Sequence, residues 1–139
     1  MTPMTRPPIE ATLTWRGDLL FDATAGAHTV PIDSANAAGV SPMYALAFAL
    51  AGCMAVDVVT ILQKGRHHLT ALDVRLRGVR APEPPSYFTD VTLHYVLVGS
   101  APDDAVQRAI DLSREKYCSV LHTLRSDLTL TITHEITAG

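Results

Sequence analysis

The chain is predicted to fold as an α+β protein. Alternating apolar and polar stretches lie at both ends, a long apolar helical stretch lies between them, and two shorter helical stretches precede the last strand. Strands and helices come in runs instead of alternating one by one, which argues against a doubly wound parallel sheet. The 139 residues are enough to bury a core, so we expect a single domain covering residues 1–139.

The composition is typical of a soluble globular protein, with 47% hydrophobic residues, 18% charged residues and a formal net charge of -3. No basic run is present, so neither nucleic acid nor a membrane is expected as a partner. The first ten residues, "MTPMTRPPIE", are polar and lack the apolar core of a secretory signal. We therefore expect a cytoplasmic protein.

The first third of the chain is predicted to form a small set of strands. Alternation and turn residues place the strands at 11–15, 19–23 and 27–33, with "RGD" as the first turn. Pro31 assigns the third strand to a sheet edge or a strand end, because proline donates no ladder hydrogen bond. Residues 34–42 are expected to form a loop.

A long helix follows this loop. Ser41 is a good N-cap, Pro42 suits the first helical position, and Gly65 is the first natural stop. The apolar run from Pro42 to Leu62 is long enough to cross a membrane, but it contains Asp57. We therefore interpret it as a buried core helix.

The second half is predicted to contain strands, then helices, then a strand. Ser100 and Asp103 resemble a capping box at the start of the first of these helices. The proline-rich "APEPPS" should connect the two strands before it. The expected elements are strands at 72–81 and 87–99, helices at 100–117 and 118–124, and a strand at 128–136.

Cys53 and Asp57 lie on the same face of the long helix, because residues four apart are neighbours at 100° per residue. The opposite face is apolar. Two interpretations are open: Cys53 is a small buried hydrophobic residue, or it is a reactive thiol. In either case Asp57 needs a partner, since an unpaired buried charge costs several kcal/mol.

A reactive Cys53 would need a nearby cation. Lowering a cysteine pKa from about 8.5 by about two units takes about 2.7 kcal/mol of differential stabilisation. Cys53 lies well inside its helix, so the helix dipole contributes little, and Asp57 would raise the pKa. An arginine brought from elsewhere could pair with Asp57 and also favour the thiolate.

Cys118 begins the short helix predicted at 118–124. Free backbone N–H groups there would favour a thiolate, although a buried cysteine at a helix junction fits the spacing equally well. Two cysteines are too few for a disulfide scaffold, and four-ligand zinc spacing is absent, so no metal site is expected. A redox pair of Cys53 and Cys118 is possible.

Two motifs resemble a known family. "SPMYALAFALAGCMAVDVVTILQK", followed by "LSREKYCSVLHTL", resembles the OsmC/Ohr family of osmotically inducible and organic-hydroperoxide-resistance proteins. It is most similar to the branch with G-C-x-x-x-D and Y-C-S-V motifs. The resemblance includes the strand order and the "W-x-G" of the first hairpin, and covers roughly residues 10–136.

The resemblance implies a thiol-dependent peroxidase that acts in oxidative-stress defence without a cofactor. Cys53 matches the cysteine that attacks the peroxide, and Cys118 matches the resolving cysteine that forms a disulfide with it. An external thiol would then reduce this disulfide. The family also implies an intertwined homodimer, with the long helices at its centre and the active sites at the subunit interface.

The chain departs from the family pattern beside the reactive cysteine. Met43 stands where the well-studied peroxidases carry a glutamate that anchors an arginine. Arg16, in the first turn, is the candidate for that arginine, and Asp57 is our candidate for the anchoring carboxylate. The role of Arg16 is an expectation from the resemblance, whereas the anchoring role of Asp57 is our own hypothesis.

Two other functions remain open from the sequence. The same fold could hold a small apolar ligand between its helices without catalysis, with cysteines that titrate normally. Alternatively, Cys53 could serve as the nucleophile of a thiol hydrolase acting on acyl substrates, but no histidine is clearly placed as its base.

Overall fold

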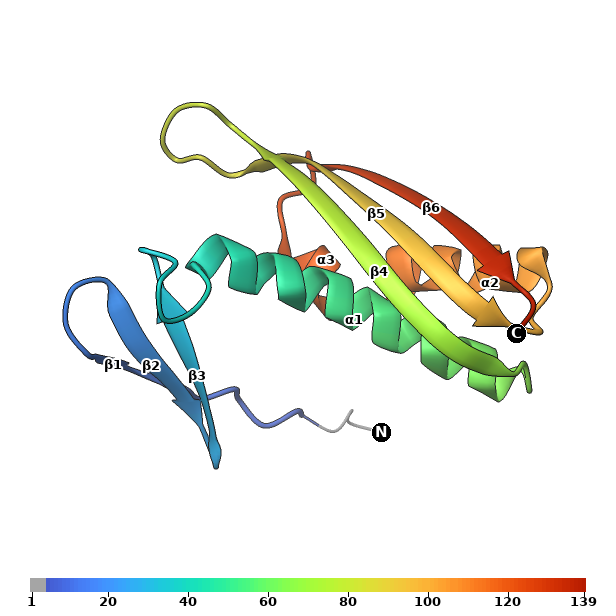
Figure 1. Ribbon diagram of the computed structural model, residues 1–139, viewed down its shortest axis with the longest axis horizontal. Helices are drawn as coiled ribbons and strands as arrows, with labels where there is room; N and C mark the ends of the chain where they lie inside the picture. Colours follow the sequence, from blue (N-terminus) through green and yellow to red (C-terminus); the bar gives the residue numbers. More distant parts are fainter. Residues whose placement is uncertain (1–4) are drawn as a thin grey trace. The chain divides into compact units, whose positions relative to one another are not determined.

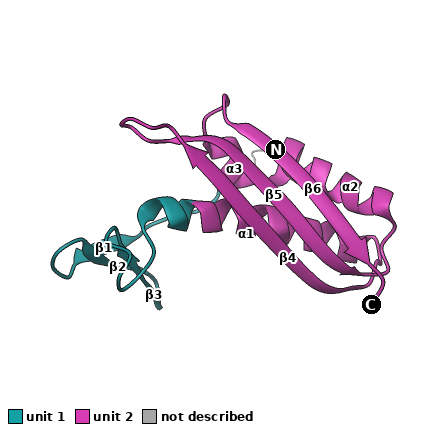
Figure 2. Cartoon of the chain, turned by 45° about the horizontal axis from the view of Figure 1, so that its top comes forward, with its two compact units in different colours: residues 1–46 teal, residues 47–139 magenta. Residues whose placement is uncertain are grey.

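The structure, a computed structural model, describes residues 5–139. They fall into two compact units, one ending at Leu46 and the other beginning at Ala47 (Figure 2). Two three-stranded sheets and a long helix confirm the α+β prediction (Figure 1). The elements in chain order are β1 Thr12–Trp15, β2 Leu20–Ala25, β3 His28–Asp33, α1 Pro42–Lys64, β4 Leu69–Arg80, β5 Phe88–Gly99, α2 Asp103–Leu112, the π-helical turn η1 Ser113–Tyr117, α3 Ser119–Thr123 and β6 Thr129–Thr137.

The first unit is an antiparallel sheet with the order β1-β2-β3. Gly17 and Asp18 have positive φ in the turn between β1 and β2, where the predicted "RGD" turn lies. Pro31 is on the edge strand β3, as expected from its missing N–H. All three predicted strands of this region are therefore present.

The loop before α1 is ordered by one buried carboxylate. Asp33 accepts hydrogen bonds from the backbone N–H groups of Ala35, Ala37 and Ala38. These bonds hold the pKa of the Asp33 carboxyl below its usual value. Ser41 then caps α1, because its hydroxyl accepts from the N–H of Tyr44 at 3.4 Å.

The second unit places helices on one face of the sheet β4-β5-β6 (Figures 1 and 2). β4 and β5 are antiparallel, whereas β5 and β6 are parallel. A parallel pair needs a long crossover connection, and the segment containing α2, η1 and α3 supplies it. Cys118 lies in this crossover, so the topology returns it to the sheet face that α1 covers.

A stripe of apolar side chains along α1 forms much of the core of the second unit. The side chains face the inner residues of β5 and α2, and on α1 they are Leu50, Met54, Val58 and Leu62. In the described part of the chain, α1 is the one helix long and apolar enough to cross a membrane. One face of α1 packs on the sheet, as predicted for a core helix, whereas Phe48 and Val56 on another face are exposed.

Two details of the helices differ from the sequence predictions. The capping box at Ser100 and Asp103 is wrong: α2 begins after Pro102, and no side chain caps it. The helix predicted over 100–117 changes to a π turn at Ser113. Propensity alone does not distinguish this wider turn from α-helix. In the structure, Ser113 at its start donates a hydrogen bond to Asp57 of α1.

Candidate active site

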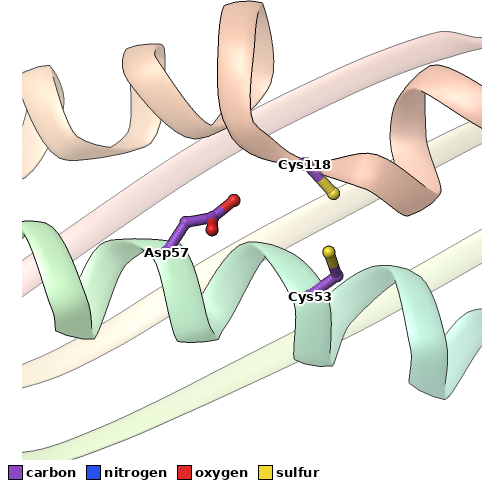
Figure 3. A group of neighbouring side chains, drawn as sticks. All are labelled: Cys53, Asp57 and Cys118. Carbon is purple, nitrogen blue, oxygen red and sulfur yellow. The ribbon is translucent and has the colours of Figure 1, made fainter. Parts of the chain in front are cut away.

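Cys53 and Asp57 lie one helical turn apart on α1, at the edge of its buried stripe. Residues at i and i+4 share a face, so both side chains point to the same side of the helix. Figure 3 shows them directed toward the segment that carries Cys118. Both residues are half-buried.

The π turn sets the position of Cys118. The N–H of Cys118 donates to the carbonyl oxygen of Ser113 at 2.9 Å, which closes the turn and ends the helical run. Cys118 then adopts an extended backbone and becomes the N-cap of α3. Its sulfur accepts the N–H of Leu121 at 3.4 Å, and its side chain is fully buried.

The fold brings three of the four predicted site residues together. The two sulfur atoms and a carboxylate oxygen of Asp57 all lie within 4.8 Å of one another (Figure 3). Both cysteines are unpaired thiols. This arrangement suits two kinds of chemistry: formation of a disulfide across α1 and the crossover, and coordination of a soft metal ion.

The environment of Cys118 favours the thiol form. Burial is the largest effect and raises the pKa of Cys118 to about 11, with Cys53 and Asp57 acting in the same direction. The hydrogen bond from Leu121 lowers the pKa but does not outweigh burial. The predicted N-terminal position is confirmed, and of the two interpretations left open by the sequence the structure shows the buried cysteine at a helix junction.

Asp57 is partnered by a hydroxyl group. Ser113, which is fully buried, donates its Oγ hydrogen to Asp57 Oδ2 at 2.8 Å. Among residues 5–139, Asp57 forms no ion pair with a lysine or arginine. The need for a partner is thus met by Ser113, which the sequence analysis did not identify.

Arg16 lies in the first unit, just after β1. Its Nε is 3.3 Å from Asp22 Oδ2, and its side chain is 58% exposed. The pairing of Arg16 with the cysteine site stays a prediction.

Tyr95 is a second residue that sequence reasoning missed. It is fully buried on β5, and its hydroxyl has no hydrogen-bond partner within the described residues. Burial raises its pKa, and the neighbouring Cys118 and Asp57 raise it further. Alternation along β5 already placed Tyr95 on the inner face, and a tyrosine hydroxyl there was the available signal.

The nearest histidine on the crossover does not act on the Cys118 sulfur. The ring nitrogens of His122 contact the carbonyl oxygens of Cys118 and Glu115, at 2.7 and 3.2 Å. Among residues 5–139, the polar contacts of the two thiols come from the cluster itself and from the N–H of Leu121.

The profile of the family described as OsmC-like protein matches residues 34–133, which include both cysteines. The chain belongs to the OsmC-like family. This confirms the resemblance seen in the sequence. Protein YhfA of Escherichia coli is 38% identical over 134 residues, which is 94% of this chain and all of that protein.

Solved structures share the fold of this chain. A hypothetical protein from Aquifex aeolicus superposes with a TM-score of 0.90 at 28% identity, covering 96% of this chain and 99% of that one. An organic hydroperoxide resistance protein from Legionella pneumophila has a TM-score of 0.71 at 11% identity, covering 95% and 99% of the two chains. At that identity the Legionella structure shows the fold alone.

Proposed function

We propose that this OsmC-like protein is a thiol-dependent peroxidase that reduces hydroperoxides, organic ones in preference to hydrogen peroxide. The observation that supports the proposal most is the distance between Cys53 and Cys118, whose sulfurs lie within 4.8 Å although 65 positions separate them in the chain. The hydroperoxide-resistance proteins that share the fold support the substrate class.

The first step oxidises Cys53. Its thiolate attacks the terminal oxygen of the hydroperoxide, an S–O bond forms, and the O–O bond breaks. The alkoxide leaves and takes up a proton to become an alcohol. The peroxide gains two electrons, and Cys53 becomes a sulfenic acid. Cys53 is assigned this step because it is half-buried, whereas Cys118 is fully buried.

The second step joins the two sulfurs. The Cys118 thiol loses its proton and attacks the sulfur of Cys53, and the hydroxyl of the sulfenic acid leaves as water. Because the pKa of Cys118 is raised to about 11, this attack needs a proton acceptor. The Asp57 carboxylate is close enough to serve, and the hydroxyl of Ser113 keeps it in place. An external thiol then reduces the disulfide.

We propose Arg16 as the cation that activates Cys53. A guanidinium has five N–H donors, so the contact of Arg16 Nε with Asp22 leaves others for a thiolate. Replacing Arg16 with alanine should slow the reaction of Cys53 with hydroperoxide, whereas a lysine in its place should preserve part of the rate. An unchanged rate in the alanine variant would exclude this role.

We also propose a homodimer of single-domain chains in the cytoplasm. On α1, the residues Phe48 and Val56 are 60% and 64% exposed, an unusual pattern for the central helix of a small protein in water. They line an apolar groove with residues of β4, and a second copy of α1 would cover it. The full lining is Phe48, Ala51, Gly52, Ala55, Val56, Val59, Thr60, Leu72 and Val74.

The same groove favours a second candidate function, the binding of a small apolar ligand without catalysis. Its volume of about 580 Å³ is within the range of ligand sites. In that case both cysteines would survive peroxide treatment as thiols.

Stopped-flow measurement of peroxide consumption tests the enzymatic proposal. We expect Cys53→Ser to abolish consumption, and Cys118→Ser to consume one equivalent and then recycle poorly. Ser119→Ala, an exposed change next to Cys118, is the matched control and should behave as wild type. If Cys53→Ser consumed peroxide as fast as wild type, the peroxidase proposal would fail.

A further inference from the structure

Cys53, Asp57 and Cys118, the residues of the proposed peroxidase chemistry, together also form a donor set for a metal ion. Its three ligand atoms lie within 4.8 Å of one another. In a tetrahedral zinc site with Zn–S of about 2.3 Å and Zn–O of about 2.1 Å, ligand atoms are about 3.6 to 3.8 Å apart. The present spacing therefore needs at most a movement of about 1 Å to close around one ion.

The charges of the cluster also favour a dication. Two thiolates and a carboxylate would carry three negative charges, and no lysine or arginine of residues 5–139 forms an ion pair with Asp57. Besides burial, the pKa of Cys118 is shifted by the N–H of Leu121, by Cys53 and by Asp57. None of these groups is a cation. A divalent ion would offset the negative charge of this donor set.

Tyr95 gives an independent indication of a ligand. Its side chain is 0% exposed, and its hydroxyl has no partner within the described residues, although buried hydroxyls usually have one. It lies close enough to Cys118 and Asp57 for their charges to act on it. A metal-bound thiolate is a hydrogen-bond acceptor, and such outer contacts are common around metal ligands.

We propose that the reduced protein binds one zinc ion per chain through Cys53, Asp57 and Cys118, with a fourth position open to water. Sulfur ligands select a thiophilic ion over magnesium or calcium. Binding displaces the two thiol protons, so one Zn²⁺ enters and up to two H⁺ leave, with no change in oxidation state. A Cys53–Cys118 disulfide removes both thiolates, so zinc binding and disulfide formation exclude each other; this consequence alone rests on the proposed function.

Cobalt and zinc titrations of the reduced full-length protein test the site without any peroxide. We expect one equivalent of Co²⁺ to give a sulfur-to-cobalt charge-transfer band, and Zn²⁺ to displace it. Loss of a residue that hydrogen-bonds to a metal ligand lowers metal affinity by about 10-fold or more. Asp57→Asn removes a ligand itself, so it should lower zinc affinity at least about 10-fold. The sulfur-to-cobalt band should remain, because both cysteines are kept. Tyr95→Phe should weaken zinc binding about 10-fold.

Control samples distinguish this site from adventitious binding. Asp111→Asn, an exposed change on α2, should bind zinc as wild type does. Wild-type protein alkylated at Cys53 should lose the band, which avoids any folding defect of a variant. A wild-type titration without the charge-transfer band, or equal zinc affinity in Asp57→Asn and wild type, would overturn the proposal. An absence of peroxidase activity would overturn the proposed function but not the zinc site, because the titrations use no peroxide.

Discussion

The raised pKa of Cys118 leads to a quantitative prediction. The pKa of Cys118 is raised from 9.0 to about 11, so at pH 8 the folded protein should hold roughly 100-fold less Cys118 thiolate than the unfolded chain. Since the thiolate is the reactive form, Cys118 alkylation should be slower by at least this factor. Its rate should rise with pH up to about pH 11, the value of the raised pKa.

Replacing Asp57 with asparagine removes one negative charge while keeping an oxygen that can accept from Ser113. The Asp57 carboxylate and the Cys118 thiolate lie within 4.8 Å of each other. Two unit charges at that distance repel by about 0.9 kcal/mol at the dielectric constant of water and by about 3.5 kcal/mol at an effective value of 20. Burial is the largest cause of the shift and Asp57 the smallest, so the lower figure applies. The pKa of Cys118 should fall by about 0.6 in Asp57→Asn.

The assay is the pH dependence of iodoacetamide labelling at Cys118, followed by peptide mass spectrometry. The same thiol in urea-unfolded protein is the matched control and should titrate near its ordinary value. An unchanged or raised Cys118 pKa in Asp57→Asn would show that the carboxylate does not act on this sulfur.

Two further predictions concern the packing around the site, and a third concerns the proposed dimer. Ser113→Ala leaves the Asp57 carboxylate without its donor and should cost about 1.5 to 3 kcal/mol of unfolding free energy in urea, and equal stability would contradict the hydrogen bond. Tyr95→Phe removes an unpartnered buried hydroxyl and should leave the metal-free protein as stable or about 1 kcal/mol more stable, whereas a clear loss would reveal a partner. Phe48→Glu should convert a dimer to a monomer in analytical ultracentrifugation, while Gln63→Glu, on the same helix, should not; a dimer that survives Phe48→Glu places the interface elsewhere.

Most of the elements of the fold could be predicted from the sequence because their signals are local. Ser41 and Pro42 mark the start of α1, and alternation marks the inner face of β5, where Val91, Leu93 and Tyr95 are buried. The predicted stop at Gly65 is confirmed, because α1 ends at Lys64; the residue with positive φ there is Arg66.

The site was only partly predictable. The face shared by Cys53 and Asp57 follows from helical periodicity alone. The partners of these residues depend on long-range packing: Ser113 reaches Asp57 through a π turn, and the burial that raises the pKa of Cys118 comes from the closed core. A single sequence carries no local signal for either contact.

The central claim is that Cys53 and Cys118 form one redox pair. Reduced protein treated with one equivalent of an organic hydroperoxide, quenched by alkylation and digested without reductant, tests it most directly by mass spectrometry. We predict a Cys53–Cys118 disulfide in each chain and no such product in Cys118→Ser. Both cysteines recovered as alkylated thiols after the peroxide has been consumed would contradict the account.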